Sequence, residues 1–87
     1  MAVIILSHDV NDFEAWKPHY YADAGRRESL GLRDLAVGNA ADNPNKVYII
    51  WEGDPVKVDQ MLNDPELPEL MKNAGVLSAP EVTVVNT

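Results

Sequence analysis

The sequence of 87 residues predicts an α+β fold, in which helices cover one face of a four-stranded antiparallel sheet. The expected elements follow the order strand, helix, strand, strand, helix, strand (βαββαβ), which is the ferredoxin-like plan. The strands expected at residues 2–8 and 46–52 are apolar on both sides, and right-handed crossovers place these same two strands in the centre. The length suits a single domain, residues 1–87.

The first strand is expected at residues 2–8, because residues 2–6 are continuously apolar and rich in β-branched side chains. Side chains alternate along a strand, so Val3 and Ile5 point to one side and their neighbours point to the other. Both sides are apolar, which is typical of a central strand that is covered on both faces.

One long helix is expected over residues 11–31. Asn11 is a suitable N-cap, Glu14 can complete a capping box, and Gly31 is the expected left-handed stop. Pro18 lacks an amide donor, so we expect either a kink there or a helix that restarts at this residue. Four side chains recur at helical spacing and are expected to face the core: Phe13, Trp16, Tyr20 and Ala24.

A less apolar second strand is expected at residues 32–39, near an edge of the sheet, and a turn at residues 39–45. The third strand, residues 46–52, has an apolar core sequence that reads VYIIW. The two sides of this strand are both apolar, and its side chains divide into Val47, Ile49 and Trp51 on one side and Tyr48 and Ile50 on the other.

The second helical region begins with Asp54 as N-cap and Pro55 at the first helical position. The Asn-Asp-Pro sequence at residues 63–65 breaks this helix, and a second short helix is expected to end at Gly75. The last strand is expected at residues 80–85.

Two helical regions can cover only one face of the sheet, so the central strands would expose apolar side chains on the other. Such a patch usually marks an interface. The sequence therefore predicts a two-fold homodimer that packs sheet face against sheet face, with an isolated chain as the alternative.

Three short patterns give a resemblance to a known group of proteins. They are V-x-D-F-x-x-W-K-x-x-Y with a later arginine and glycine, an N-P turn followed by E-x-D, and P-x-L-x-x-x-M-x-x-A-G-V. Their residues here are Val10, Asp12, Phe13, Trp16, Lys17, Tyr20, Arg27 and Gly31, then Asn43, Pro44, Glu52 and Asp54, then Pro65, Leu67, Met71, Ala74, Gly75 and Val76. The chain resembles the dimeric α/β-barrel superfamily, which includes antibiotic-biosynthesis monooxygenases, and is most similar to its short uncharacterised bacterial members.

This resemblance implies a pocket between the first helix and the sheet, lined by Trp16, Tyr20 and Trp51. Aromatic rings suit a flat, aromatic or polyketide-like ligand, although rings at this spacing also serve as core packing. Arg27 lies on the same side of the helix and could hold an anionic group of the ligand. Its alternative is an ion pair with an acid on the last strand or the second helix.

The candidate catalytic residues are the two histidines, His8 at the end of the first strand and His19 in the helix. Either could act as a general acid or base near neutral pH. The alternatives are a surface pair of His19 with Asp23 and a position at the rim of the sheet for His8.

Two functions stay open from the sequence: a small dimeric protein that binds a hydrophobic or aromatic ligand, or a cofactor-independent monooxygenase, cyclase or isomerase. Haem degradation is disfavoured, because the relatives that degrade haem need a histidine in the second helical region, and residues 55–75 have none. No cofactor is expected. The expected partners are a second copy of the chain and a small molecule.

Charge and composition exclude several other classes of function. The net charge is −7 and no basic patch exists, so nucleic acid is not an expected partner. The chain has no cysteine, and no apolar run reaches the length of a membrane span. Two histidines without a carboxylate at a diagnostic spacing predict no metal site. A cytoplasmic location is expected.

Overall fold

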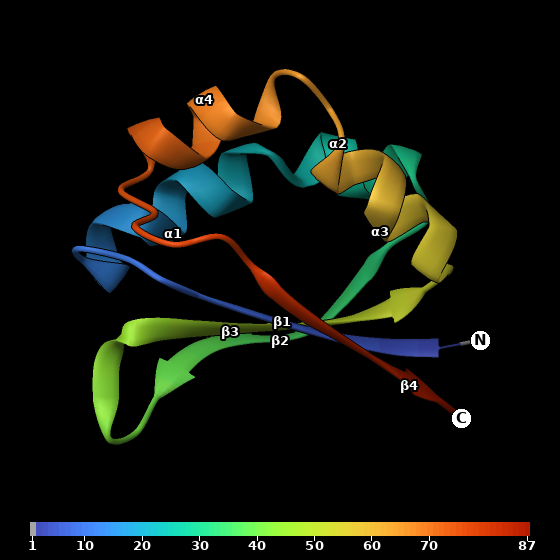
Figure 1. The fold of residues 1–87 in the computed structure, drawn as a ribbon, viewed down its shortest axis with the longest axis horizontal. Coiled ribbons are helices and arrows are strands. Elements are labelled where there is room, and N and C mark those ends of the chain that lie inside the picture. Colours follow the sequence, from blue (N-terminus) through green and yellow to red (C-terminus); the bar gives the residue numbers. More distant parts are fainter. Residues whose placement is uncertain (1) are drawn as a thin grey trace.

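A computed structural model describes residues 2–87 and has the predicted α+β architecture, with each helical region divided in two (Figure 1). The strands pair antiparallel in the order β2-β3-β1-β4, as the ferredoxin-like plan requires. The elements are β1 (Ala2–Asp9), α1 (Phe13–Ala22), α2 (Ala24–Ser29), β2 (Arg33–Ala40), β3 (Asn43–Gly53), α3 (Pro55–Leu62), α4 (Leu67–Asn73) and β4 (Glu81–Asn86).

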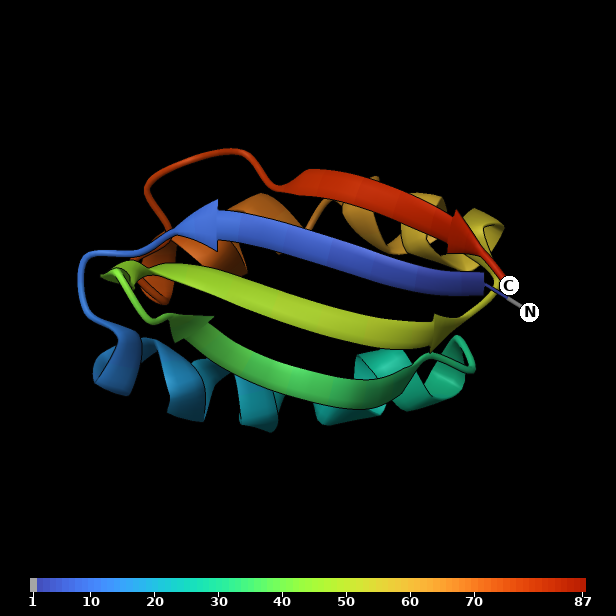
Figure 2. The same cartoon turned by 90° about the horizontal axis from the view of Figure 1, so that it is seen from below.

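The helices lie on one face of the sheet in two lines. Figure 2 looks onto the face without helices and shows α1 and α2 along the β2 side and α3 and α4 along the β4 side. None of the helices in residues 2–87 has the length and apolar character needed to cross a membrane.

The two central strands confirm the predicted alternation. Ile4 of β1 pairs with Trp51 of β3, and both are buried beneath the helices. The next pair, Ile5 and Ile50, faces the side without helices and is partly exposed. Both sides of the central strands are therefore apolar, while the helices cover only one of them.

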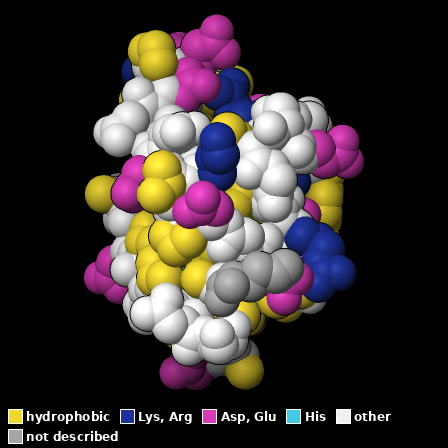
Figure 3. Space-filling model, turned by 90° about the vertical axis from the view of Figure 1, so that its right-hand side faces the viewer, with side chains coloured by type: hydrophobic (Ala, Val, Ile, Leu, Met, Phe, Trp, Pro, Cys, Tyr) yellow, Lys and Arg dark blue, Asp and Glu magenta, His cyan; other side chains and the backbone are white. Residues whose placement is uncertain are grey.

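The face of the sheet that carries no helix is called the open face below. The register places Val3, Ile5, Ile50 and Val85 on it. Figure 3 views the end of the molecule where both termini lie and shows hydrophobic side chains gathered in the lower, sheet-bearing half.

The prediction of one continuous helix over residues 11–31 was wrong, because the segment forms two helices, α1 and α2. The chain breaks at Asp23, with φ −92° and ψ 14°, and does not restart at Pro18, which lies inside α1. Pro18 is exposed, so water can solvate the carbonyl that loses its amide partner there. At the break, the amide of Asp23 donates to the carbonyl of Tyr20 over 3.2 Å, and the carboxylate of Asp23 pairs with Arg26.

The N-cap of α1 is Asp12 and not Asn11. The carboxylate of Asp12 accepts hydrogen bonds from the amides of Glu14 at 3.0 Å and Ala15 at 3.4 Å. A carboxylate caps better here because it also meets the positive end of the helix dipole. The predicted stop at Gly31 is confirmed, since its φ of +70° is a conformation that glycine adopts without strain.

The turn before β3 is shorter than predicted. Strand β2 continues to Ala40 and strand β3 begins at Asn43, so only residues 41 and 42 form the turn. Pro44 is tolerated in the hairpin because the register shifts between Asn39 and Ala40, so Pro44 lies at an irregularity where the ladder needs no amide from it. The predicted cap of α3 is confirmed, since Asp54 accepts from the amide of Val56 over 2.9 Å.

Candidate functional site

A cavity of about 330 Å³ lies between the two lines of helices and the buried face of the sheet. Its wall is mainly apolar, and it includes six of the side chains singled out above. From the sheet come Leu6, His8, Ile49 and Trp51; from α1 and α2 come Trp16, His19, Tyr20, Ala22 and Arg27; from α3 and α4 come Met61, Leu62, Leu67, Leu70 and Met71. The structure therefore brings all of the predicted site residues to one cavity.

A continuous row of planar groups forms one wall of the cavity. The ring of His8 meets that of Trp16 edge-on, with centroids 5.6 Å apart. Trp16 stacks on Tyr20 at 5.0 Å with an interplanar angle of 29°, and the guanidinium of Arg27 lies 3.6 Å from the centre of the Tyr20 ring. Phe13 stacks on Trp16 at 5.9 Å as well, so the ring faces of the row pack on one another and the row forms an apolar aromatic wall.

Hydrogen bonds fix the inner end of this row. The indole nitrogen of Trp51 donates to the hydroxyl of Tyr20 over 2.8 Å, and that hydroxyl donates to Asp34 over 2.6 Å. Burial, together with the bond to Asp34, raises the pKa of Tyr20, so the phenol stays protonated at physiological pH. Tyr20 is thus held as a donor and acceptor and is not a phenolate base.

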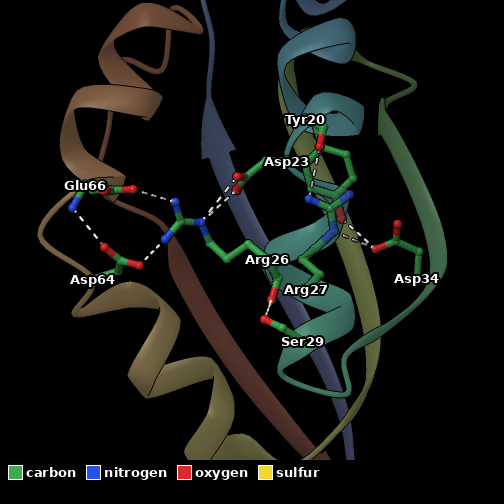
Figure 4. Close-up of polar contacts among 8 residues, drawn as sticks. All are labelled: Tyr20, Asp23, Arg26, Arg27, Ser29, Asp34, Asp64 and Glu66. Carbon is green, nitrogen blue, oxygen red and sulfur yellow. Dashed lines mark hydrogen bonds and ion pairs between the residues drawn. The ribbon is translucent and has the colours of Figure 1, made fainter.

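The ionic partner of Arg27 is Asp34 of β2, with 3.5 Å between Nε and Oδ1 (Figure 4). The alternative predicted from the sequence, an acid on the last strand or the second helix, was therefore wrong. Arg27 also donates from Nη1 to the carbonyl of Tyr20 over 3.0 Å, and its side chain is 5% exposed. Within residues 2–87 its Nη2 atom has no hydrogen-bond partner.

Sequence reasoning missed Asp34. The residue lies near the start of a strand that is only weakly apolar, where a single acid does not stand out from the other charged residues. Its place comes from strand pairing, because Asp34 is in register with Trp51 and so points toward the helices. A correct register for the edge strand would have been the signal.

The two histidines differ in their surroundings. His8 is not a rim residue, since it is only 6% exposed and β1 continues one residue beyond it. His19 is exposed, and Asp23, its alternative partner, pairs with Arg26. No group of three or more histidines and acids that could hold a metal ion is found among the described residues.

Burial of the His8 ring predicts a pH dependence of folding. Burial lowers the pKa of His8 below its ordinary value of 6.5, and its Nδ1 atom has no hydrogen-bond partner within residues 2–87. Below about pH 6.5, His8 is protonated in the unfolded chain but still neutral in the folded protein. The free energy of unfolding therefore falls as the pH drops.

We expect wild type to lose more unfolding free energy in urea between pH 7.5 and pH 5.5 than the variant His8→Gln. The matched control is His19→Gln, which removes the other histidine from an exposed position of α1, and an equally reduced pH dependence in this variant would show that the effect is not specific to His8. If the unfolding free energy of wild type and of His8→Gln changed equally with pH, folding would not lower the pKa of His8.

The fold is that of the ferredoxin-like proteins called antibiotic biosynthesis monooxygenases and NIPSNAP proteins. A solved structure of an uncharacterised NIPSNAP domain protein from Burkholderia xenovorans superposes with a TM-score of 0.70 at 13% identity, over 100% of this chain and 94% of that one. A NIPSNAP family protein of unknown function from Agrobacterium tumefaciens gives 0.68 at 12% identity, over 98% and 86% of the two chains. An antibiotic biosynthesis monooxygenase gives 0.63 at 19% identity, over 100% and 98%.

No protein-family model and no curated protein matches the sequence. Identities of this size establish a shared fold, and a shared fold hosts many functions. The fold alone therefore does not define the function, which depends on the residues that line the cavity.

Proposed function

We propose that the protein binds a small hydrophobic or aromatic molecule in the cavity between α1 and the sheet, and that it acts as a homodimer. The supporting observation is the cavity, about 330 Å³ in volume and mainly apolar, with Trp16 and Tyr20 stacked along its wall. Binding sites for small molecules are typically apolar hollows of this size with few polar groups.

Each predicted binding residue has a distinct part in this proposal. Trp16 and Tyr20 form an apolar aromatic wall beside the space that a ligand would fill, while Trp51 supports Tyr20 through its hydrogen bond. Arg27 holds Tyr20 from the other side and keeps its charge balanced by Asp34. The wall is thus ordered before any ligand arrives, which reduces the entropic cost of binding.

The homodimer rests on the open face. Its central side chains, Val3, Ile5 and Ile50, are apolar, and none of the helices within residues 2–87 covers them. A second copy packed by two-fold symmetry would bury this patch and give a core with sheets on both sides.

Filling the cavity with a side chain is the test of ligand binding. Ala22 and Ala15 are both exposed residues of α1, but only Ala22 lines the cavity. We expect Ala22→Phe to raise the Kd of a two-ring probe, 2-naphthol, at least about tenfold, because the new ring occupies the space of the probe. Isothermal titration calorimetry measures both Kd values.

The variant Ala15→Phe is the matched control, since it makes the same change on the same helix outside the cavity. It should bind 2-naphthol as wild type does. Equal weakening in both variants would place the binding site elsewhere, and no heat of binding to wild type would contradict the proposed function for two-ring ligands.

A second candidate function is a cofactor-independent monooxygenase, cyclase or isomerase acting on an aromatic or polyketide-like substrate. The observation in its favour is that both histidines line the cavity beside the aromatic row. Burial keeps His8 neutral, which is the form that can accept a proton. Exchange of the α-hydrogens of 1-tetralone with deuterium, faster with wild type than with His8→Gln, would support this function over simple binding.

A further inference from the structure

The two lines of helices on either side of the cavity are tied together by backbone bonds at one end. Val10, just before α1, forms a β-bridge with Val76, which follows α4. Beside it the amide of Asn11 donates to the carbonyl of Gly75 over 3.0 Å. The amide of Leu77 donates to the carbonyl of Asp9 over 2.8 Å. Backbone bonds of this kind, close to the sheet, make this end of the cavity a fixed joint.

At the other end, a single side chain joins the two lines. Arg26 of α2 reaches the connection between α3 and α4, where its guanidinium binds Asp64 and, over 3.3 Å, Glu66 (Figure 4). Its Nε atom also pairs with Asp23 over 3.2 Å. The side chain of Arg26 is 17% exposed, and its guanidinium pairs with three carboxylates that are 30–77% exposed.

The carboxylates of this cluster stand next to the cavity wall. Asp23 itself lines the cavity, and so do Leu62 and Leu67, which flank the α3–α4 connection. The other ion pairs between described side chains lie within α1, between α2 and β2, or between two strands. Arg26 therefore provides the only ionic link between the two lines of helices among the described side chains.

We propose that Arg26, with Asp64 and Glu66, forms an electrostatic latch that holds the two lines of helices together at the α2 end. The cavity is open to solvent beside exposed lining residues such as His19 and Leu70, and it widens to admit or release a ligand when this latch opens. The fixed joint at the Val10 end lets the α3–α4 connection swing without unfolding the sheet. The statement about ligand passage rests on the proposed function, whereas the opening itself does not.

The chemistry of the cluster suits a latch. Asp64 is 30% exposed and Glu66 is 77% exposed, so the ion pairs lie at the protein surface. Pairs of this kind contribute modestly to stability and weaken as salt screens them. Segments held by such contacts open locally far more often than the whole domain unfolds.

Quenching of tryptophan fluorescence by acrylamide tests the latch without a ligand. The only two tryptophans, Trp16 and Trp51, both line the cavity and are 3% and 2% exposed. Acrylamide is small and uncharged, so its access to these rings reports how often the cavity opens. The variants are Arg26→Gln, which removes the cation, and Asp64→Asn, which removes a charge but keeps a side-chain acceptor for the amide of Glu66.

The matched control is Arg33→Gln, which removes the ion pair of Arg33 with Glu52 on the sheet. We expect both latch variants to raise the quenching constant at least about twofold, with the control unchanged. We expect high salt to raise quenching in wild type but not in Arg26→Gln. Quenching at the wild-type level in Asp64→Asn and at high salt, or an equal rise in the control, would overturn the latch. Asp64→Asn and the salt series decide the matter if Arg26→Gln does not fold.

Exchange of 2-naphthol, measured by NMR line broadening, then separates the two proposals. We expect faster association and dissociation in the latch variants, with a smaller change in Kd. Raised quenching without any naphthol binding would support the latch and contradict the proposed function. Binding with unchanged exchange rates and unchanged quenching would support the function and overturn the latch.

Discussion

Replacing Trp51 with alanine is expected to lower the free energy of unfolding by about 3–5 kcal/mol. Trp51 is 2% exposed at the centre of β3, and its loss would leave a void between the sheet and the helices. It would also remove the donor that the hydroxyl of Tyr20 accepts. Since a domain of this size is stable by only about 5–15 kcal/mol, the variant would be close to unfolding.

Urea unfolding followed by circular dichroism measures this loss. The control is Tyr21→Ala, which also removes an aromatic ring, but one that is 54% exposed on α1. We expect this control to stay within about 1 kcal/mol of wild type. A loss below about 1 kcal/mol in Trp51→Ala, or equal losses in both variants, would contradict the described core.

Replacing Ile50 with glutamate is expected to dissociate the proposed homodimer. Ile50 pairs with Ile5 on one side and Ala36 on the other, so it lies at the centre of the open face. Two-fold symmetry brings two such charges into one interface, and an unpaired buried charge there costs several kcal/mol. We expect the dissociation constant of the dimer to rise at least about a hundredfold.

Light scattering at micromolar concentration distinguishes a 9.6 kDa chain from a dimer of twice that mass. The matched variant is Val56→Glu, which places the same charge on an exposed position of α3. It should remain a dimer. A wild-type protein that scatters as a single chain would refute the homodimer, and an intact Ile50→Glu dimer would place its interface elsewhere.

The sheet could be predicted from the sequence because its signal is local. Alternation along residues 2–8 and 46–52 identifies strands with two apolar sides, and the element order then places them together. The N-cap at Asp54 and the helix end at Gly31 could also be predicted from the sequence, because each depends on the chemistry of one residue.

The parts of the site that escaped prediction depend on distant contacts. The break at Asp23 has little local signal, and it lets Arg27 reach the carbonyl and the ring of Tyr20. The partnership of Arg27 with Asp34 requires the register of β2, which shifts between Asp34 and Ala36. A shift of one residue reverses the side to which a strand residue points, so composition alone could not place Asp34.

The cavity beside Trp16 and Trp51 is the proposed binding site for a flat aromatic molecule. Nitrogen–proton NMR spectra of wild type during titration with 2-naphthol test it most directly, because the chain has only two indole N–H groups and both rings line the cavity. We expect saturable shifts of both indole signals, with amides of Ile5 and Val85 on the open face unaffected. Shifts confined to the open face, or none at saturating 2-naphthol, would contradict it.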